Sequence, residues 1–331
     1  MLNIAHYKLS SPLLQAPMAG VTDRVYRDLV REHGAGMATS EMVTSDLSLI
    51  STQKTQSRLP QLDECSPRSV QIVGTDPKTM PMAAQLYASK GAELIDINFG
   101  CPVKKVACKG AGAALLQNIP MMVKMTKAVV DATELPVTVK TRLGWDEDTK
   151  YIVEVAERLQ DVGIQAISIH GRTRKQMYKG EADWSLIAAV KENARMNIPV
   201  FGNGDVFSPE IALEKRQKYG VDGVMIGRAS IGYPWIFREI KHFFATGEHL
   251  TPPSMAERIE AAERHLEMSV KWKGERVGIN EMRRHYTNYF KGIPNFKEHR
   301  MKLVTQDSYE VIKEVFEEIK ANYSGEEMSL V

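Results

Sequence analysis

A cysteine that follows an apolar run is the first residue of this sequence that could do chemistry. Residues 95–116 read IDINFGCPVKKVACKGAGAALL, so Cys101 stands between a run of buried type and a loop rich in lysine and glycine. Positive charge from Lys104, Lys105 and Lys109 should lower the pKa of the thiol and let it exchange a proton near neutrality. An inert buried cysteine is the usual alternative. A loop of this composition is costly to order, which favours the chemical role for Cys101.

Polar residues also end two later apolar runs. Lys140 ends the run 137–141, and a buried ammonium there needs an anionic or strongly polar partner. That partner is either a bound ligand or a carboxylate of a neighbouring run, such as Asp96. The run 166–170 continues into HGRTR at 170–174, which is too polar for a simple turn, although Arg174 also fits a solvated loop.

The last two apolar runs end in Asn-Gly-Asp at 203–205 and in Gly-Arg at 227–228. In barrels of alternating strands and helices, the loops after the seventh and eighth strands bind phosphate through backbone N–H groups. One Asn-Gly-Asp turn is common, but both signals at successive runs favour a phosphate-bearing ligand. In APMAG at 16–20, small residues let the backbone approach a flat ring, and Met18 is either a polarizable surface for that ring or core filler.

Eight short apolar runs alternate with helical patterns and must position these residues. Such alternation predicts a parallel sheet with helical crossovers, and eight units favour a (β/α)₈ TIM barrel over a doubly wound open sheet. The predicted strands are 13–16, 37–43, 69–73, 94–98, 137–141, 166–170, 199–202 and 223–226. The predicted helices are 23–33, 45–56, 77–90, 120–132, 149–162, 184–192 and 208–219.

The strand signal stops near residue 246, and Thr-Pro-Pro at 251–253 predicts a hinge into an all-helical segment. Ser254 and Glu257 have capping-box spacing, and apolar residues then follow the helical period. We therefore expect a barrel domain over 1–246 and a small helical C-terminal domain over 252–331.

Composition limits the class of protein. The 331 residues are 43% hydrophobic and 25% charged, as in globular proteins, with no apolar stretch long enough for a membrane span and no signal-peptide layout at the start. Three cysteines without metal-ligand spacing argue against a disulfide framework and against zinc, so we expect a cytoplasmic protein without a metal.

Charge is unevenly distributed although the net charge is only +2. Residues 264–302 carry ten Lys/Arg against four Asp/Glu, with aromatic residues between them, whereas residues 303–331 carry two against seven. A basic segment with interleaved aromatics is typical of an RNA-binding surface. The alternative is an ordinary solvated helix face. The interleaved aromatics are Trp272, Tyr286, Tyr289 and Phe290.

Seven motifs together resemble the bacterial tRNA-dihydrouridine synthases, and most closely their B-type subgroup. The resemblance spans nearly the whole chain in order, and the Gly-Cys-Pro loop is its most specific part; Phe99 stands where we associate a methionine with the family. The motifs are APMAGVTD at 16–23, INFGCPVKKV at 97–106, GAGAALL at 110–116, VKTRLGW at 139–145, IHGRTR at 169–174, FGNGDV at 201–206 and MIGRASIGYPWIF at 225–237.

The resemblance implies an FMN-dependent enzyme that reduces the C5–C6 bond of specific uridines in the D-loop of tRNA, with NADPH or NADH as reductant. It implies that Cys101 is the general acid and that the protein binds tRNA as a monomer. The implied FMN contacts are Pro17, Met18, Ala19, Gln71, Lys140, His170, Asn203, Gly204, Asp205, Gly227 and Arg228. The implied substrate contacts are Asn98, which would orient the uracil, and Lys104, Lys105, Arg142, Arg172, Arg283 and Arg284.

Two other functions remain open from the sequence. A small-molecule flavin oxidoreductase of the dihydroorotate dehydrogenase or enoate type would use the same ring and phosphate signals, but would not need the basic helical segment. A noncatalytic RNA-binding protein could keep the barrel as a scaffold, and it would purify without a flavin.

Overall fold

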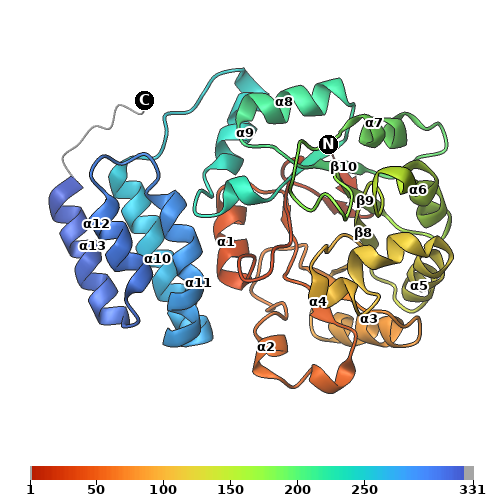
Figure 1. The fold of residues 1–331 in the computed structure, drawn as a ribbon, viewed down its shortest axis with the longest axis horizontal. Helices are drawn as coiled ribbons and strands as arrows, with labels where there is room; N and C mark the ends of the chain where they lie inside the picture. The colour runs from red at the N-terminus through yellow and green to blue at the C-terminus, as the bar shows by residue number, and fades with distance from the viewer. Residues whose placement is uncertain (1, 324–331) are drawn as a thin grey trace.

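Nine parallel strand segments make up the main sheet of the computed structural model, which describes residues 2–323 (Figure 1). Their order around the sheet is β4-β3-β11-β10-β9-β8-β7-β6-β5. The bounds are β3 (Leu13–Gln15), β4 (Met37–Ala38), β5 (Val43–Thr44), β6 (Ser69–Val73), β7 (Leu94–Asn98), β8 (Val137–Arg142), β9 (Ala166–His170), β10 (Val200–Asn203) and β11 (Gly223–Ile226).

The sheet closes on itself because β4 and β5, at its two ends, are consecutive pieces of one stretch of chain. Thr39, directly after β4, forms a bridge with Ser69 of β6, and β5 pairs with the same strand. The predicted second strand, 37–43, is therefore split in two. The first and last strands meet where β3 pairs with β11, and the fold is the predicted (β/α)₈ barrel.

Helices follow the strands and cover the outside of the barrel. The bounds are α1 (Arg24–Glu32), α3 (Thr79–Ser89), α5 (Ile119–Asp131), α6 (Ile152–Asp161), α7 (Ser185–Glu192), α8 (Pro209–Lys218) and α9 (Ile236–Thr246). Shorter turns of helix lie in the loops, at η1 (Leu47–Leu49), α2 (Gln53–Gln56), α4 (Lys104–Ala107), η2 (Gly112–Gln117), η3 (Glu147–Thr149) and η4 (Arg228–Ser230). The helix α9 was not among the predicted helices.

A hairpin of β1 (Asn3–Ile4) and β2 (Tyr7–Lys8), also absent from the predictions, precedes the barrel. Ile4 is 1% exposed and belongs to the same apolar cluster as Leu14, Leu94 and Phe201 inside the barrel. Leu94 and Ala166 are the first residues of their strands. The hairpin therefore fills the amino-terminal end of the barrel and leaves the other end for a site.

Four helices follow the barrel in the part of the chain that the structure describes: α10 (Met255–Lys273), α11 (Glu275–Tyr289), α12 (Lys297–Thr305) and α13 (Tyr309–Tyr323). Ser254 and Glu257 form the predicted capping box at the start of α10. Figure 1 shows these helices as a bundle beside α1. Residues 324–331 of the predicted C-terminal domain lie outside the described residues.

The helical bundle docks on the loops that follow the first and last barrel strands. Lys273 at the end of α10 makes a buried ion pair with Asp23, which caps α1 by accepting a hydrogen bond from the Tyr26 N–H. On α11, the Asn288 side chain donates to the Ile231 carbonyl at 2.7 Å, and the Gly232 N–H donates to Nδ1 of His285 at 3.2 Å.

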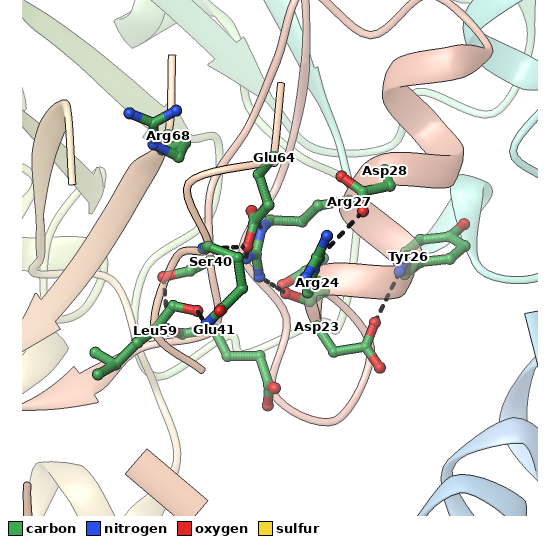
Figure 2. A network of polar contacts seen from close by, with 12 residues as sticks. Asp23, Arg24, Tyr26, Arg27, Asp28, Ser40, Glu41, Leu59, Glu64 and Arg68 are labelled. Atoms are coloured by element: carbon green, nitrogen blue, oxygen red, sulfur yellow. Dashed lines mark hydrogen bonds and ion pairs between the residues drawn. The ribbon is translucent and has the colours of Figure 1, made fainter. Parts of the chain in front are cut away.

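The start of α1 is also fixed from the barrel side. Arg27 lies against Glu64 with two guanidinium N–H groups on the carboxylate, and both side chains are 5% exposed (Figure 2). An ion pair with this geometry satisfies both charges and holds the loop 59–64 against α1. None of the helices described is both long and apolar enough to cross a membrane.

Candidate active site

A cavity of about 470 Å³ opens where the strands end. It lies at the carboxyl ends of the strands, where barrel enzymes place their sites. The structure brings together in its wall every residue that the sequence assigned to the cofactor: Pro17, Met18, Ala19, Gln71, Lys140, His170, Asn203, Gly204, Asp205, Gly227 and Arg228. Asn98, Cys101 and Arg142 line the same cavity.

Buried side chains beside the cavity are linked by successive hydrogen bonds that end at the backbone of Cys101. Gln71 Nε2 donates to Asp96 at 2.7 Å, and Asn98 Nδ2 donates to Gln71 Oε1 at 2.7 Å. Asn98 Oδ1 then accepts from the N–H groups of Gly100 and Cys101, at 3.1 and 2.9 Å. These contacts show the Asn98 carboxamide holding the backbone of the cysteine loop, and its role in orienting the uracil stays a prediction.

Arg142 holds the same loop from the other side. Its Nε donates to the Gly100 carbonyl at 2.7 Å, and Nη1 donates to the carbonyls of Thr173 and Met177. Arg142 is 2% exposed, and burial lowers the pKa of its guanidinium to about 10. The side chain was predicted to contact the substrate, and most of its donors are used to fix the loops around Cys101.

The pKa of the Cys101 thiol changes in the direction opposite to the prediction. Burial raises this pKa, and the Val103 N–H, Arg142 and Lys140 offset that effect only in part. The lysines Lys104 and Lys105 lie on the exposed helix α4 and are not among the groups that act on the thiol. The expectation of a lowered pKa was therefore wrong, because desolvation of the thiolate outweighs the positive charge. A thiol in this environment stays protonated at neutral pH, as a proton donor must.

Lys140 has no carboxylate partner among residues 2–323. Its Nζ donates to Asn203 Oδ1 at 3.3 Å, whereas the Asp96 carboxylate accepts from Gln71 and from Thr138 Oγ1 at 2.7 Å. The alternative of a Lys140–Asp96 ion pair is therefore wrong. Burial, followed by repulsion from Arg142, lowers the pKa of Lys140 to about 8. The ammonium faces the cavity with one neutral partner, so it can pair with an electron-rich or anionic ligand.

Two arginines, one histidine and one carboxylate meet at the other side of the cavity. Burial, and then the charges of Arg142, Lys140, Arg172 and Arg228, lower the pKa of His170 well below its usual value, so its imidazole is neutral. Asp205 accepts two hydrogen bonds from Arg172, at 2.9 and 2.7 Å, and one from Arg228 at 3.0 Å. Burial acts to raise the pKa of Asp205, but these hydrogen bonds and charges hold it below the usual value.

Arg172 and Arg228 differ in what they can contact. Arg172 is 2% exposed, donates to the carbonyls of Lys179 and Gly180, and fixes Asp205, while its contact with substrate stays a prediction. The Arg228 side chain is 45% exposed and lines the cavity. Asp205 therefore orients Arg228, and Arg228 is the group that can reach an anion.

Sequence reasoning missed two aromatic residues at the cavity mouth. Tyr178 and Phe207 are 53% and 51% exposed, and both line the cavity. The Arg228 guanidinium carbon lies 5.1 Å from the Tyr178 ring centroid and 5.6 Å from that of Phe207. Both residues stand in loops, where no periodic pattern marks them, and their exposure beside a cavity became evident only in three dimensions.

The aromatic residues of the basic segment are not arranged as predicted. Tyr286, Tyr289 and Phe290 are at most 4% exposed and belong to the apolar core, so they cannot stack on bases. Trp272 is half-buried and donates from Nε1 to the Ser57 carbonyl at 3.2 Å. These aromatics follow the helical period because they pack the bundle against itself and the barrel.

The positive charges of the segment divide into two groups. Arg264, Lys273, Arg283 and Lys302 pair with carboxylates, and Arg283 holds both Asp307 and the Gln306 carbonyl. Arg284 reaches the Ala19 carbonyl at 3.2 Å, at the rim of the cavity. Arg284 and five other exposed basic residues have no ion pair to any described residue, and the five are Lys271, Arg276, Lys291, Lys297 and Arg300.

No cluster of three or more His, Cys, Asp or Glu side chains that could hold a metal ion occurs within residues 2–323.

Two solved structures share the fold. A 2-naphthoyl-CoA reductase in complex with 2-naphthoyl-CoA aligns with a TM-score of 0.57 and 13% identity, over 73% of this chain and 51% of the other. Histamine dehydrogenase from Rhizobium sp. 4-9 aligns with a TM-score of 0.54 and 12% identity, over 81% of this chain and 50% of the other. The chain thus spans about half the length of each of these structures.

Sequence relatives cover nearly the whole chain. The tRNA-dihydrouridine synthase B of Pseudomonas aeruginosa is 46% identical over 300 residues, which are 91% of this chain and 90% of the relative. The tRNA-dihydrouridine synthase B of Proteus vulgaris is 42% identical over 320 residues, 97% of each chain. The sequence model of the dihydrouridine synthase family matches residues 14–323, and the chain belongs to that family.

Proposed function

We propose that the protein is a tRNA-dihydrouridine synthase, which uses FMN to reduce the C5–C6 bond of specific D-loop uridines in tRNA. Membership of the family and the names of relatives that match over most of the chain support this proposal. So does the chemistry of the cavity, whose wall contains a half-buried lysine, a protonated thiol and an exposed arginine.

The observation that carries the proposal is the unpaired ammonium of Lys140. A largely desolvated charge with one neutral partner is costly unless a ligand completes its surroundings. The Lys140 side chain is half-buried, and within residues 2–323 its ammonium has only Asn203 as a hydrogen-bond partner. The oxygen and nitrogen atoms along the polar edge of a flavin ring are such a ligand. The cavity of about 470 Å³ lies within the range that cofactors occupy. The residues present therefore fit FMN.

The proposed cradle has a ring side and a phosphate side. Pro17, Met18, Ala19 and Gln71 would face the ring. On the phosphate side, Asn203, Gly204 and Gly227 would bring backbone close to the ribityl phosphate, with neutral His170 beside them. Arg228, oriented by Asp205, would supply the positive charge. When bound, FMN reduced by NADPH or NADH supplies the hydride that adds to C6 of the uracil.

Cys101 would act as the general acid. Hydride addition to C6 leaves negative charge on C5 and O4 of the pyrimidine, and a thiol that is protonated at neutral pH can give its proton to C5. The S–H bond breaks as the C5–H bond forms, and solvent then returns a proton to the thiolate. Asn98 and Arg142 hold the cysteine loop in place for this transfer.

The two proposed functions, catalysis and tRNA binding, belong to different parts of the chain. We propose that residues 1–246 form the FMN-binding catalytic domain and residues 252–331 a helical tRNA-binding domain. A base in folded tRNA must leave its stack to reach the cavity, so a second surface must hold the RNA. Lys104 and Lys105 beside the cavity, Arg284 at its rim and the unpaired basic residues of the helices would bind phosphates. Such a protein would act as a monomer in the cytoplasm, where tRNA is.

The test is reduction of tRNA by the purified protein. With FMN, NADPH or NADH, and tRNA that lacks dihydrouridine, we expect uridines to gain two hydrogens, measured by mass spectrometry of the digested nucleosides. Cys101→Ala should retain bound FMN but lose about a hundredfold or more in turnover, since general acids contribute factors of this order. The matched control is Cys108→Ala, which changes an exposed cysteine of the same loop.

Other outcomes would point elsewhere. Turnover of a small pyrimidine or enoate with no reduction of tRNA would favour a small-molecule oxidoreductase. A colourless protein that releases no flavin would favour a noncatalytic RNA-binding protein. Mapping dihydrouridine in tRNA from cells that lack the protein would identify the modified positions.

A further inference from the structure

The loop after the first barrel strand contains a tight turn that borders the cavity. The Val21 N–H donates to the Met18 carbonyl at 3.1 Å, and Gly20, the third residue of the turn, has φ of +70°. This combination is the signature of a type II turn. Types I and II differ mainly in the orientation of the central peptide, which here joins Ala19 to Gly20. That peptide follows directly on Pro17 and Met18, which line the cavity.

Both polar groups of this one peptide are held by charged side chains. Glu41 Oε1 accepts from the Gly20 N–H at 2.6 Å, and Arg284 Nη1 donates to the Ala19 carbonyl at 3.2 Å. The carboxylate therefore meets the positive end of the peptide dipole, and the guanidinium meets the negative end. Hydrogen bonds to charged groups are about twice as strong as neutral ones. A flipped peptide would turn its carbonyl toward Glu41 and its N–H toward Arg284.

The two charged residues come from distant parts of the chain. Glu41 is 4% exposed, follows β4, and is fixed by Arg58, whose Nη2 donates to it at 3.0 Å. Arg284 belongs to α11 of the helical bundle, and its guanidinium lies so close to Gly20 that a Cβ at that position would clash with it. The backbone conformation thus favours glycine at position 20, and any larger residue would also displace the Arg284 guanidinium.

We propose that Glu41 and Arg284 are positioning residues that clamp the Ala19–Gly20 peptide in its type II orientation and so fix the ring side of the cofactor cavity. The helical bundle then has a second role besides contact with RNA, because it completes the cavity of the barrel through Arg284. The proposal rests on the proposed function in one respect, namely that the occupant of the cavity is FMN.

The clamp is tested by amide hydrogen exchange of the full-length protein, followed by mass spectrometry of peptides that cover residues 17–22. In Arg284→Ala we expect exchange in this segment about tenfold faster than in the wild type, because the Gly20 N–H is freed when the peptide can flip. Arg284 is exposed, so its loss should leave folding intact. The matched control is Arg264→Ala, which removes another arginine contact between the bundle and the barrel, to Glu32. It should leave exchange at 17–22 unchanged.

The link to the cavity is tested by FMN affinity, measured by quenching of flavin fluorescence on titration of the apoprotein. We expect Arg284→Ala and Glu41→Gln each to weaken FMN binding several-fold, up to about tenfold. The double variant should be no weaker than about the worse single variant, because both residues act on one peptide.

Each outcome decides one part of the proposal. Unchanged exchange in Arg284→Ala, or equal acceleration in Arg264→Ala, overturns the clamp. Faster exchange with unchanged FMN affinity, or fully additive losses in the double variant, overturns the link to the cavity. A wild-type protein that binds no FMN contradicts the proposed function instead, and the exchange experiment still decides whether the clamp exists.

Discussion

Lys140 and Cys101 face one cavity, and burial moves the pKa of each toward its uncharged form. For Lys140 the pKa falls to about 8, and for Cys101 it rises. At neutral pH the lysine is still mostly charged, whereas the thiol keeps its proton. The cavity therefore offers one positive charge and one transferable proton, beside a histidine that burial keeps neutral.

Under the proposed function, in which FMN occupies the cavity, the pKa of Lys140 predicts how FMN affinity depends on pH. The ammonium is charged below about pH 8 and loses its charge as the pH rises through that value, so the attraction to the polar edge of the flavin is lost. We expect FMN affinity to be constant near pH 7 and to fall by up to about tenfold by about pH 9, since one unit of pKa shift on binding corresponds to a tenfold change. Fluorescence titrations across this range measure the effect.

Lys140→Met is the matching variant. It should bind FMN more weakly at pH 7 and with a flat pH profile. If its affinity falls with pH as steeply as that of the wild type, another group is responsible. His170 should not contribute to the pH dependence, because its imidazole stays neutral in this range.

Single residues show where sequence reasoning reached its limit. The spacing of polar residues at strand ends correctly brought Lys140, His170, Asn203 and Arg228 to one cavity, because parallel strands end at one face. Which atoms pair within the cavity could not be predicted. Asp96 and Lys140 stand at neighbouring strands, yet Gln71 and Thr138 satisfy the carboxylate. The pKa of Cys101 depends on burial depth, which composition does not reveal.

Among the secondary-structure elements, the apolar runs of the sequence predicted the strands reliably. Interruptions within a predicted strand were not predicted. Strands such as β7 and β9 match the predictions at both ends, because each is a short β-branched run between turns. The second strand splits because residues 39–42 leave the regular ladder after the Thr39 bridge. The helix α9 was missed although its buried residues Ile236, Phe237 and Ile240 follow the helical period.

The same reasoning corrects the prediction for the helical segment. Interleaved aromatics indicated stacking on RNA, but a residue with helical period can equally face a core, and three of the four do. The remaining feature of this segment that fits the proposed RNA contact is its positive charge. Lys297 and Arg300 lie one turn apart on α12 and are exposed, and neither has an ion pair with a described residue.

Charge on α12 predicts a salt effect. The double variant Lys297→Ala/Arg300→Ala should bind tRNA more weakly at low salt, and the slope of log affinity against log salt should fall in magnitude by about 1.5, because each phosphate contact releases slightly less than one counterion. Fluorescence anisotropy with labelled tRNA over a series of salt concentrations gives the slope.

A lysine of the neighbouring helix serves as the control. Lys313 on α13 lies 3.6 Å from Glu310, and Lys313→Ala removes a similar exposed charge. Its slope should match that of the wild type. An unchanged slope in the α12 variant would show that RNA binds to another face.

At the scale of the whole molecule, a buried cluster of aromatic rings joins barrel and bundle. The rings of Tyr26, His265 and His285 lie within 5.4 Å of one another, measured between centroids, and the hydroxyl of Tyr26 donates to the Ser230 carbonyl. His265 contacts the Tyr289 hydroxyl at 3.1 Å. Among the charged groups, Asp23 raises the pKa of His265 and Lys273 lowers it. Arg284 and Lys273 lower the pKa of His285.

Acid should therefore loosen the docking of the bundle. Burial lowers the pKa of His265 to about 4, and that of His285 falls well below the usual value. Below about pH 6.5 the unfolded chain binds protons that the folded chain does not, so the free energy of unfolding falls as the pH falls. Between about pH 6.5 and pH 5, His265 alone should cost about 2 kcal/mol. Urea unfolding at a series of pH values measures the loss.

His265→Gln separates this histidine from other acid-sensitive groups. The variant keeps a neutral polar side chain beside Tyr289 and cannot take up a proton. It should lose about 2 kcal/mol less than the wild type over the same acidification. Equal losses in both proteins would mean that His265 does not control the acid response.

The bundle docks where the first and last strands of the barrel meet, with Asn288 on the Ile231 carbonyl and Lys273 on Asp23. During synthesis on the ribosome, β3 emerges first and must wait for β11, more than half the chain later, before the cylinder can close. The residues of the bundle that contact this junction, Lys273 and Asn288, emerge later still. Co-translational folding therefore completes the cofactor cavity among its last steps, and a nascent chain released before α11 has formed would carry a barrel whose two ends meet without those contacts.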